Sequence, residues 1–185
     1  MMDIKERAKK IKAVVLDVDG VLTDGGIYES ENKELLKRFN CRDGLGLTLA
    51  RKSGLKLAII TGRLSPPVEY RAKELKFDGF WQGVMDKRDA YKELKEKFSL
   101  TDEEICYVGD DLIDLPILTQ VGLAAAVADA APEVKERVHY IAKFNGGYGA
   151  CRDVIEFILK AQGKWDDIVN GYLAKESQDM EGLSQ

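Results

Sequence analysis

The chain of 185 residues has few of the residues that build cross-linked or zinc-binding proteins, with three cysteines and one histidine. Cys41, Cys106 and Cys151 lie far apart and form no C-x-x-C pair, which indicates neither a disulfide framework nor a zinc site. We therefore expect reduced thiols, which are typical of a cytoplasmic protein. The single histidine, His139, lies outside every motif described below, and we interpret it as structural.

Long apolar runs and an excess of positive charge are also missing. No apolar stretch approaches the length of about 18 residues that a membrane span requires. The N-terminal segment MMDIKERAKKIK is charged, and Asp17 interrupts the apolar run that follows it, so no signal peptide is indicated. The formal net charge of −4 argues against nucleic acid as the main partner. These absences predict a cytoplasmic protein that binds neither membrane nor nucleic acid.

Short apolar segments alternate with segments of helical periodicity along the chain. We expect buried strands over residues 13–18, 56–61, 104–109 and 122–127. We expect helices over residues 43–53, 65–75, 89–98 and 152–163, and a short helical turn at 101–104. This alternation predicts an α/β fold with a parallel sheet and helices on both faces. We expect one domain over residues 1–175 and a loose polar tail over 176–185.

Residues 25–40 do not fit this alternation. They alternate around the turn-prone triplet SEN at 30–32, which predicts a β-hairpin projecting from the sheet. A surface excursion with no further role is the alternative interpretation.

Polar residues gather where the predicted strands end. Ligands of parallel sheets bind beyond the carboxyl ends of the strands, so residues there are candidates for a site. The residues at this edge are Asp17, Asp19, Thr61, Arg63, Lys87, Asp110, Asp111 and Asp114.

The residue types at this edge suit a metal ion and a phosphoryl group. Carboxylate oxygens without a histidine or thiolate beside them suit Mg²⁺. Thr61 and Lys87 add a hydroxyl donor and a positive charge, which a phosphoryl group requires. Taken singly, Asp17 and Asp19 are compatible with a simple turn, and Asp110 with a helix N-cap. Their occurrence in order at one edge favours a magnesium-dependent phosphoryl-transfer site.

Four motifs resemble those of the haloacid dehalogenase superfamily of phosphotransferases: DVDGVLT (17–23), Thr61, Lys87 and GDDLID (109–114). The resemblance implies a Rossmann-like sheet and a magnesium-dependent phosphatase with an aspartyl-phosphate intermediate. It implies that Asp17 is the nucleophile and a metal ligand. Asp19 would be the general acid and base and would ligate the metal through its backbone carbonyl.

The resemblance also assigns the remaining motif residues. It implies that Asp110 is the third protein ligand of the metal, with Asp111 and Asp114 beside the ligands. Thr61 and Lys87 would hold the phosphoryl oxygens.

Further segments are similar to the family of sugar-acid phosphatases within that superfamily, including FNCRDGLG (39–46), QGVMDK (82–87) and GGYGACRDVIEFILKAQGK (146–164). This similarity implies hydrolysis of 3-deoxy-D-manno-octulosonate 8-phosphate on the route to lipopolysaccharide. The implied substrate-binding residues are Asn40, Arg42, Asp43, Gly44, Arg63, Arg71 and Lys87. Arg63 offers a bidentate fork to a sugar carboxylate and stands where relatives acting on a nine-carbon acid look like they carry glutamate. Thr48 departs from the basic residue expected at its position.

The spacing of the motifs leaves no room for a cap domain between Asp17 and Thr61 or between Thr61 and Lys87. An uncapped site is open to water, so we expect a neighbouring subunit to close it. The resemblance implies a homotetramer in which the hairpins of residues 25–40 meet at the centre. Residues 164–175 would reach a neighbour's site.

Three alternatives remain open at this point. The chain could be a phosphatase for another sugar phosphate, such as the 9-phosphate of the nine-carbon acid. It could be a phospho-accepting signalling domain, which also uses clustered aspartates, magnesium, a threonine and a lysine, although Asp19 and Thr61 are then unexplained. It could also be an inactive subunit kept for assembly, although all four motif residues are present.

Overall fold

A six-stranded parallel sheet forms the centre of the protein, in a computed structural model that describes residues 3–31 and 35–174. The strand order is β5-β4-β1-β6-β7-β8. The strands are β1 (Ala13–Leu16), β4 (Lys56–Thr61), β5 (Gly79–Gln82), β6 (Ile105–Gly109), β7 (Leu123–Ala126) and β8 (Tyr140–Ile141). The predicted parallel α/β fold is therefore confirmed.

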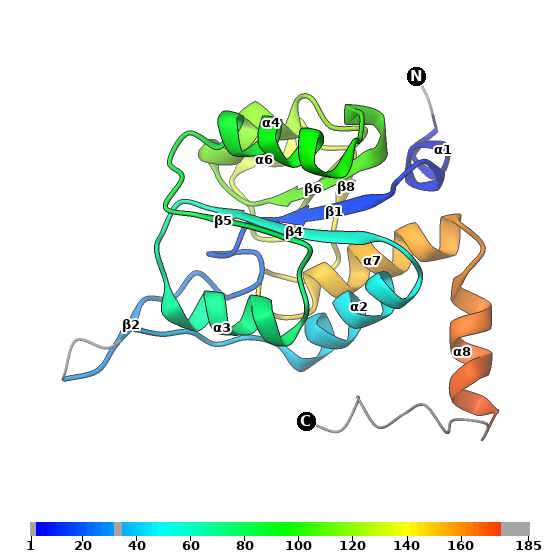
Figure 1. The fold of residues 1–185 in the computed structure, drawn as a ribbon, viewed down its shortest axis with the longest axis horizontal. Coiled ribbons are helices and arrows are strands. Elements are labelled where there is room, and N and C mark those ends of the chain that lie inside the picture. The colour runs from blue at the N-terminus through cyan, green and yellow to red at the C-terminus, as the bar shows by residue number, and fades with distance from the viewer. Residues whose placement is uncertain (1–2, 32–34, 175–185) are drawn as a thin grey trace.

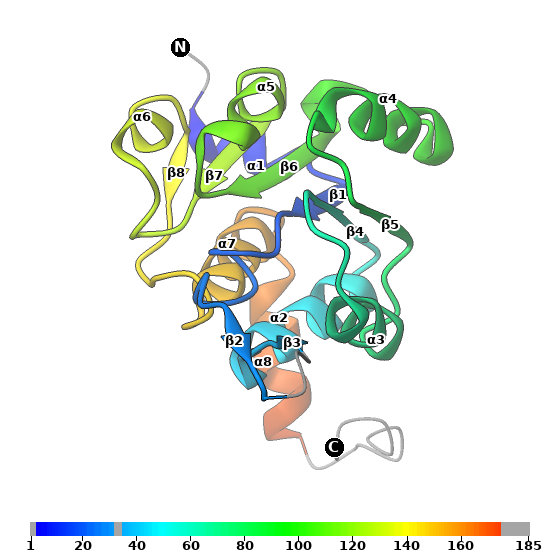
Figure 2. The same ribbon diagram turned by 90° about the vertical axis from the view of Figure 1, so that its left-hand side faces the viewer.

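Helices cover both faces of this sheet. One face carries α4 (Lys87–Phe98), α5 (Leu115–Leu118) and α6 (Pro132–Lys135) (Figures 1 and 2). The other face carries α2 (Cys41–Lys52), α3 (Pro66–Glu74) and α7 (Ala150–Ala161). The four residues of β1 are fully buried because the strand has a parallel neighbour on each side and helices above and below.

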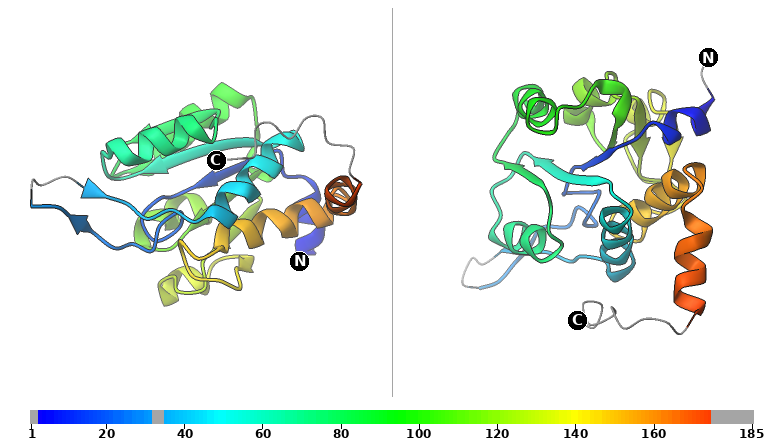
Figure 3. Two further views of the ribbon diagram at one scale, coloured as in Figure 1. Left: turned by 90° about the horizontal axis from the view of Figure 1, so that it is seen from below. Right: turned by 45° about the vertical axis from the view of Figure 1, so that its right-hand side comes forward.

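The predicted hairpin is present and projects from the carboxyl edge of the sheet. It consists of β2 (Tyr28–Glu29) and β3 (Leu35–Leu36), which pair antiparallel. Part of the predicted turn, at Asn32, lies outside the described residues. The hairpin and α8 (Trp165–Leu173) lie at opposite ends of the molecule (Figures 1 and 3).

Several short or polar elements, apart from the turn at 101–104, are not expected from the sequence. The charged N-terminal segment forms α1 (Ile4–Lys9), where Asp3 caps the helix through the amide of Lys5 at 3.3 Å. Strand β8 has only two residues, too few for an alternating pattern. The turn at 101–104 forms the 3₁₀ helix η1 (Asp102–Glu104) with the expected capping box. A second 3₁₀ helix is η2 (Leu112–Asp114).

Apart from the hairpin, the intervals between the motifs hold only the elements that connect the strands of the sheet. The hairpin and α2 fill the interval from Asp17 to Thr61, and α3 and β5 fill the interval from Thr61 to Lys87. The described residues therefore include no cap domain. The single domain over residues 1–175 stays a prediction, and its tail, 176–185, lies outside the described residues. Within residues 3–31 and 35–174, no helix has the length and hydropathy of a membrane span.

Candidate active site

The loop after β1 turns sharply back on itself at the carboxyl edge of the sheet. The carbonyl of Val18 accepts hydrogen bonds from three successive amides, those of Val21, Leu22 and Thr23, at 3.0 to 3.2 Å. Gly20 has a φ of +86°, and a Cβ there would lie 2.0 Å from Oδ2 of Asp110. The backbone of this loop is thus pressed against the Asp110 carboxylate, which only glycine permits.

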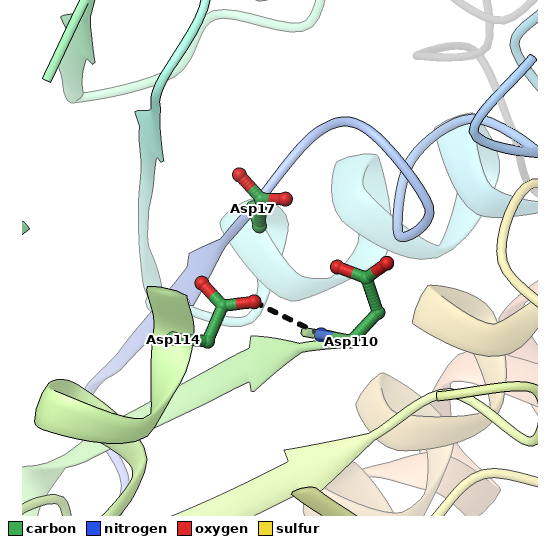
Figure 4. Close-up of side chains that lie close together, drawn as sticks. All are labelled: Asp17, Asp110 and Asp114. Carbon is green, nitrogen blue, oxygen red and sulfur yellow. Dashed lines mark hydrogen bonds between the residues drawn. The ribbon is translucent and has the colours of Figure 1, made fainter. Parts of the chain in front are cut away.

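Three aspartates converge at this edge. One carboxylate oxygen from each of Asp17, Asp110 and Asp114 lies within 4.8 Å of the other two (Figure 4). Oδ2 of Asp114 accepts the amide of Asp110 at 3.0 Å, which fixes the turn after β6. Oδ1 of Asp110 is buried and has no hydrogen-bond partner among the described residues. A hard cation such as Mg²⁺ would satisfy this oxygen, so the donor set fits the predicted metal.

Lys87 lies at the base of the cluster. Its side chain is fully buried, and Nζ donates to Oδ1 of Asp17 at 2.8 Å and to Oδ1 of Asp114 at 2.7 Å. The third donor reaches the hydroxyl of Tyr107 at 3.1 Å, and this hydroxyl itself donates to Asp114 at 2.7 Å. All three donors of the ammonium are therefore satisfied, which makes burial of the charge tolerable. Asp114 consequently orients Lys87 and the Asp110 backbone.

The pKa values of these groups reflect crowded carboxylates in a buried place. Burial raises the pKa of Asp17 to about 6, and the Lys87 charge limits the rise. Burial, followed by the nearby charges of Asp17 and Asp114, raises the pKa of Asp110 to about 8. Burial opposes the charge on Lys87, but its carboxylate partners outweigh that effect and raise the pKa of the ammonium. A bound cation would favour ionisation of both aspartates.

Asp19 lies beside the cluster and is held by two cations. Its Oδ1 is paired with Nζ of Lys37, which comes from the end of the hairpin. Its Oδ2 lies 3.7 Å from Nε of Arg63, an exposed residue just after β4. Thr61, the last residue of β4, is buried at the same edge, next to β1 in the sheet. The structure thus brings Asp17, Asp19, Thr61, Lys87 and Asp110 to one edge, as expected.

The predicted substrate loop is ordered by contacts with the last core helix. The carboxylate of Asp43 is buried and accepts the amides of Gly149 at 3.2 Å and Arg152 at 2.8 Å, so it caps the N-terminus of α7. Asn40 caps α2 through the amide of Arg42 and donates to the carbonyl of Gly147 at 3.2 Å. These contacts connect the loop to the glycine-rich segment before α7. A substrate-binding role for these side chains stays a prediction.

Arg71 packs beside this loop. Its Nη1 pairs with Glu74 at 2.7 Å, and a Cβ on Gly44 would lie 2.4 Å from its Nη2. Gly44 therefore leaves room for the guanidinium of Arg71. Gly44 and Arg71 are neighbours, which is compatible with the prediction that both bind substrate. Asp111 is exposed and caps η2 through the amide of Leu112 at 2.7 Å.

Two residues of the site were not identified from the sequence. Tyr107 lies within the buried strand β6, where its position resembles any core aromatic residue. Lys37 lies in the hairpin, and only the folded arrangement places it against Asp19. The segment around it, LLKRFN (35–40), carries a second basic residue at Arg38, so no signal in the sequence singles out Lys37.

Comparison with known proteins supports the resemblance of the motifs. Residues 81–151 match the family model of haloacid dehalogenase-like hydrolases. The 3-deoxy-D-manno-octulosonate 8-phosphate phosphatase KdsC of Escherichia coli (strain K12) is 46% identical over 165 residues, covering 89% of this chain and 88% of the relative.

Solved structures of similar fold point to the same family. The 3-deoxy-D-manno-octulosonate 8-phosphate phosphatase from Moraxella catarrhalis, in complex with magnesium, phosphate and KDO, has a TM-score of 0.89 at 40% identity, covering 91% of this chain and 97% of the other. The cobalt-bound phosphatase from Haemophilus influenzae has a TM-score of 0.86 at 38% identity, covering 90% and 99%. The chain belongs to the haloacid dehalogenase-like hydrolases, in the group of the 3-deoxy-D-manno-octulosonate 8-phosphate phosphatases.

Proposed function

We propose that the enzyme hydrolyses 3-deoxy-D-manno-octulosonate 8-phosphate to the free sugar acid and phosphate, with Mg²⁺ as its cofactor. The observation that carries this proposal is the cluster of Asp17, Asp110 and Asp114 around a buried Lys87. The unpartnered oxygen of Asp110 in that cluster supports the metal. The relatives named above support the substrate, and we place the reaction in lipopolysaccharide precursor synthesis in the cytoplasm.

Asp17 is the proposed nucleophile. Its carboxylate oxygen forms a bond to phosphorus while the bond between phosphorus and the ester oxygen breaks, which gives an aspartyl phosphate. Lys87 and Thr61 hold the phosphoryl oxygens and reduce the repulsion between two anions. When bound by Asp17, Asp110 and the Asp19 carbonyl, Mg²⁺ supplies further charge neutralisation.

Asp19 is the proposed proton carrier. It donates a proton to the departing sugar hydroxyl and then takes a proton from the water that attacks the phosphorus of the aspartyl phosphate. That second step breaks the bond between Asp17 and phosphorus and restores the carboxylate. Asp19 is suited to this role because it lies beside the cluster and is partly exposed, with 28% of its side chain accessible.

Substrate choice is assigned to Arg63 and to the loop of residues 40–44, with Arg71 behind it. Arg63 is exposed at the site, where its guanidinium can take the sugar carboxylate. We further propose a homotetramer in which a neighbouring subunit closes the site. Because α8 lies at the opposite end from the hairpin, closure by the segment 164–175 requires another copy (Figure 3).

The test is magnesium-dependent phosphate release from a panel of sugar phosphates, with Asp17→Asn as the inactive control. The panel includes the 8-phosphate of 3-deoxy-D-manno-octulosonate and the 9-phosphate of the nine-carbon acid. We expect strong preference for the eight-carbon substrate and loss of activity in the variant. Equal activity over the panel would remove the substrate assignment. No metal-dependent release from any member would remove the phosphatase and favour a signalling domain or an inactive subunit.

A further inference from the structure

The hairpin places a nearly buried cation at the proposed active site. Only 8% of the Lys37 side chain is exposed, and its ammonium is paired with Oδ1 of Asp19. Burying an ammonium is costly unless its charge and its donors are satisfied. A two-stranded ribbon that projects from the sheet is an unusual source for such a residue, because its other side chains, such as Ile27 and Leu36, are mostly exposed.

The ammonium has more donors than the protein uses. Within residues 3–31 and 35–174, Asp19 is the one group that accepts a hydrogen bond from Lys37. Lys87, in contrast, has a protein partner for each of its three donors. Lys87 must therefore exchange one of these partners to contact a phosphoryl oxygen, whereas Lys37 has donors that a ligand can use directly.

The charges around Asp19 point to the kind of ligand. Lys37 and Arg63 approach different oxygens of the same carboxylate and line one cavity at the base of the hairpin. One carboxylate offsets only one of these two charges. Under the proposed function, a phosphomonoester presents its ester oxygen to Asp19, beside these two cations. Anionic oxygens are the acceptors that an ammonium prefers.

We propose that Lys37 is a further substrate-binding residue, supplied by the hairpin, whose free N–H donors bind oxygen atoms of the phosphate group next to Asp19. This inference rests on the proposed function for its substrate and deepens it. It gives the hairpin a role within its own subunit's site, in addition to any contact between subunits. The anion that Lys37 binds is the phosphoryl group, whereas Arg63 remains free for the sugar carboxylate.

The test compares Lys37→Met, Lys37→Arg and Arg38→Met with the wild type in the full chain. Arg38 is the matched control, because it is the next residue of the chain but has other partners. Its Cζ lies 4.4 Å from the centre of the Tyr148 ring, and its Nη1 lies 3.5 Å from Oδ2 of Asp24. The binding of inorganic phosphate is measured by calorimetry with Mg²⁺ present. Steady-state kinetics give kcat and KM for the sugar phosphate, and thermal unfolding reports any loss of fold.

We expect Lys37→Met to weaken phosphate binding and to lower kcat/KM by about 10-fold or more, as for a lost hydrogen bond to a charged group. Lys37→Arg should lose less, and Arg38→Met should resemble the wild type. Phosphate affinity of Lys37→Met within about twofold of the wild type would overturn the inference. An equal loss in Arg38→Met would also overturn it, because the hairpin as a whole would then be responsible.

The two proposals can fail separately. A wild-type protein that binds phosphate through Lys37 but hydrolyses no ester would refute the proposed function and support the role of Lys37. If the wild type hydrolyses the sugar phosphate and Lys37→Met is equally active and binds phosphate equally well, the proposed function is supported and the role of Lys37 is refuted.

Discussion

At the scale of single residues, the site is a set of carboxylates that the fold holds in an unfavourable arrangement. Asp17 and Asp110 have raised pKa values because both are buried and lie close to other negative charge. Lys87 offsets part of this charge, and the rest is available to a cation. The same crowding that would destabilise the metal-free protein is therefore the source of metal affinity.

This arrangement predicts how the stability of the metal-free protein depends on pH. Burial raises the pKa of Asp110 from its ordinary value of 3.8 to about 8, so between these values the folded protein keeps a proton that the unfolded chain has lost. The free energy of unfolding should therefore fall as the pH rises from about 4 to about 8, by at most about 1.4 kcal/mol per pH unit for one proton.

Urea unfolding in the presence of a chelator would measure this slope. Asp110→Asn, whose amide does not titrate, should show a weaker dependence over the same window. Added Mg²⁺ should stabilise the wild type more at the upper end of the window, because the ligands must lose their protons to bind the metal. An equally steep slope in the variant would show that other groups carry the effect.

At the scale of elements, the turn after β1 depends on the absence of a side chain at Gly20. Gly20→Ala should weaken Mg²⁺ binding by about tenfold or more, because the new Cβ would overlap the Asp110 carboxylate at 2.0 Å. Gly54→Ala is a matched control: Gly54 has a similar φ of +90° but no atom within 4 Å of its Cβ position.

Calorimetric titration with Mg²⁺ separates the two effects of these substitutions. Both variants should lose about 1–2 kcal/mol of stability through backbone strain. Only Gly20→Ala should lose metal affinity. If both variants bind Mg²⁺ like the wild type, the close packing of Gly20 on Asp110 is not needed for the metal site.

The sequence predicts those elements whose pattern is local. Strand β4 was predicted at its observed limits because residues 56–61 form one apolar run between polar ends. Strand β1 ends two residues before the predicted 13–18, since Val18 already belongs to the turn. The two-residue strand β8 and the charged helix α1 carry no clear periodicity, and neighbours in the fold stabilise them.

The candidate site also has parts that the sequence predicts and parts that it does not. The aspartates, Thr61 and Lys87 could be placed at one edge because each ends or follows a strand or begins a helix. The pairing of Lys37 with Asp19 could not be predicted, because it depends on where the folded hairpin lies relative to the loop after β1. Nor could the sequence show that the Asp43 carboxylate is used to cap α7.

At the scale of the whole molecule, the exposed apolar side chains of the hairpin are the feature that a single copy does not explain. Ile27 and Leu36 on the two arms are more than half exposed, and Leu64 beside them is 70% exposed. A two-stranded ribbon with exposed apolar residues is marginal in water unless it packs against something. This supports the proposed contact between hairpins of neighbouring subunits.

Light scattering after size exclusion should give a mass four times the 20.7 kDa of one chain. Leu36→Glu should reduce this mass, because four charged side chains would meet at the contact, whereas Leu173→Glu, at the opposite end of the molecule, should leave it unchanged. A monomeric wild type would contradict the proposed assembly, although the chemistry of the site would stand.

The central claim is that Asp17 accepts the phosphoryl group and passes it rapidly to water. The most direct test is rapid quenching of the enzyme with Mg²⁺ and 3-deoxy-D-manno-octulosonate 8-phosphate in acid, followed by mass spectrometry of its peptides. We predict a transient phosphate on Asp17 that disappears as free phosphate forms and that is absent in Asp17→Asn, which lacks the nucleophile. Phosphate release by the wild type with no phosphorylated Asp17 at any time would contradict this claim.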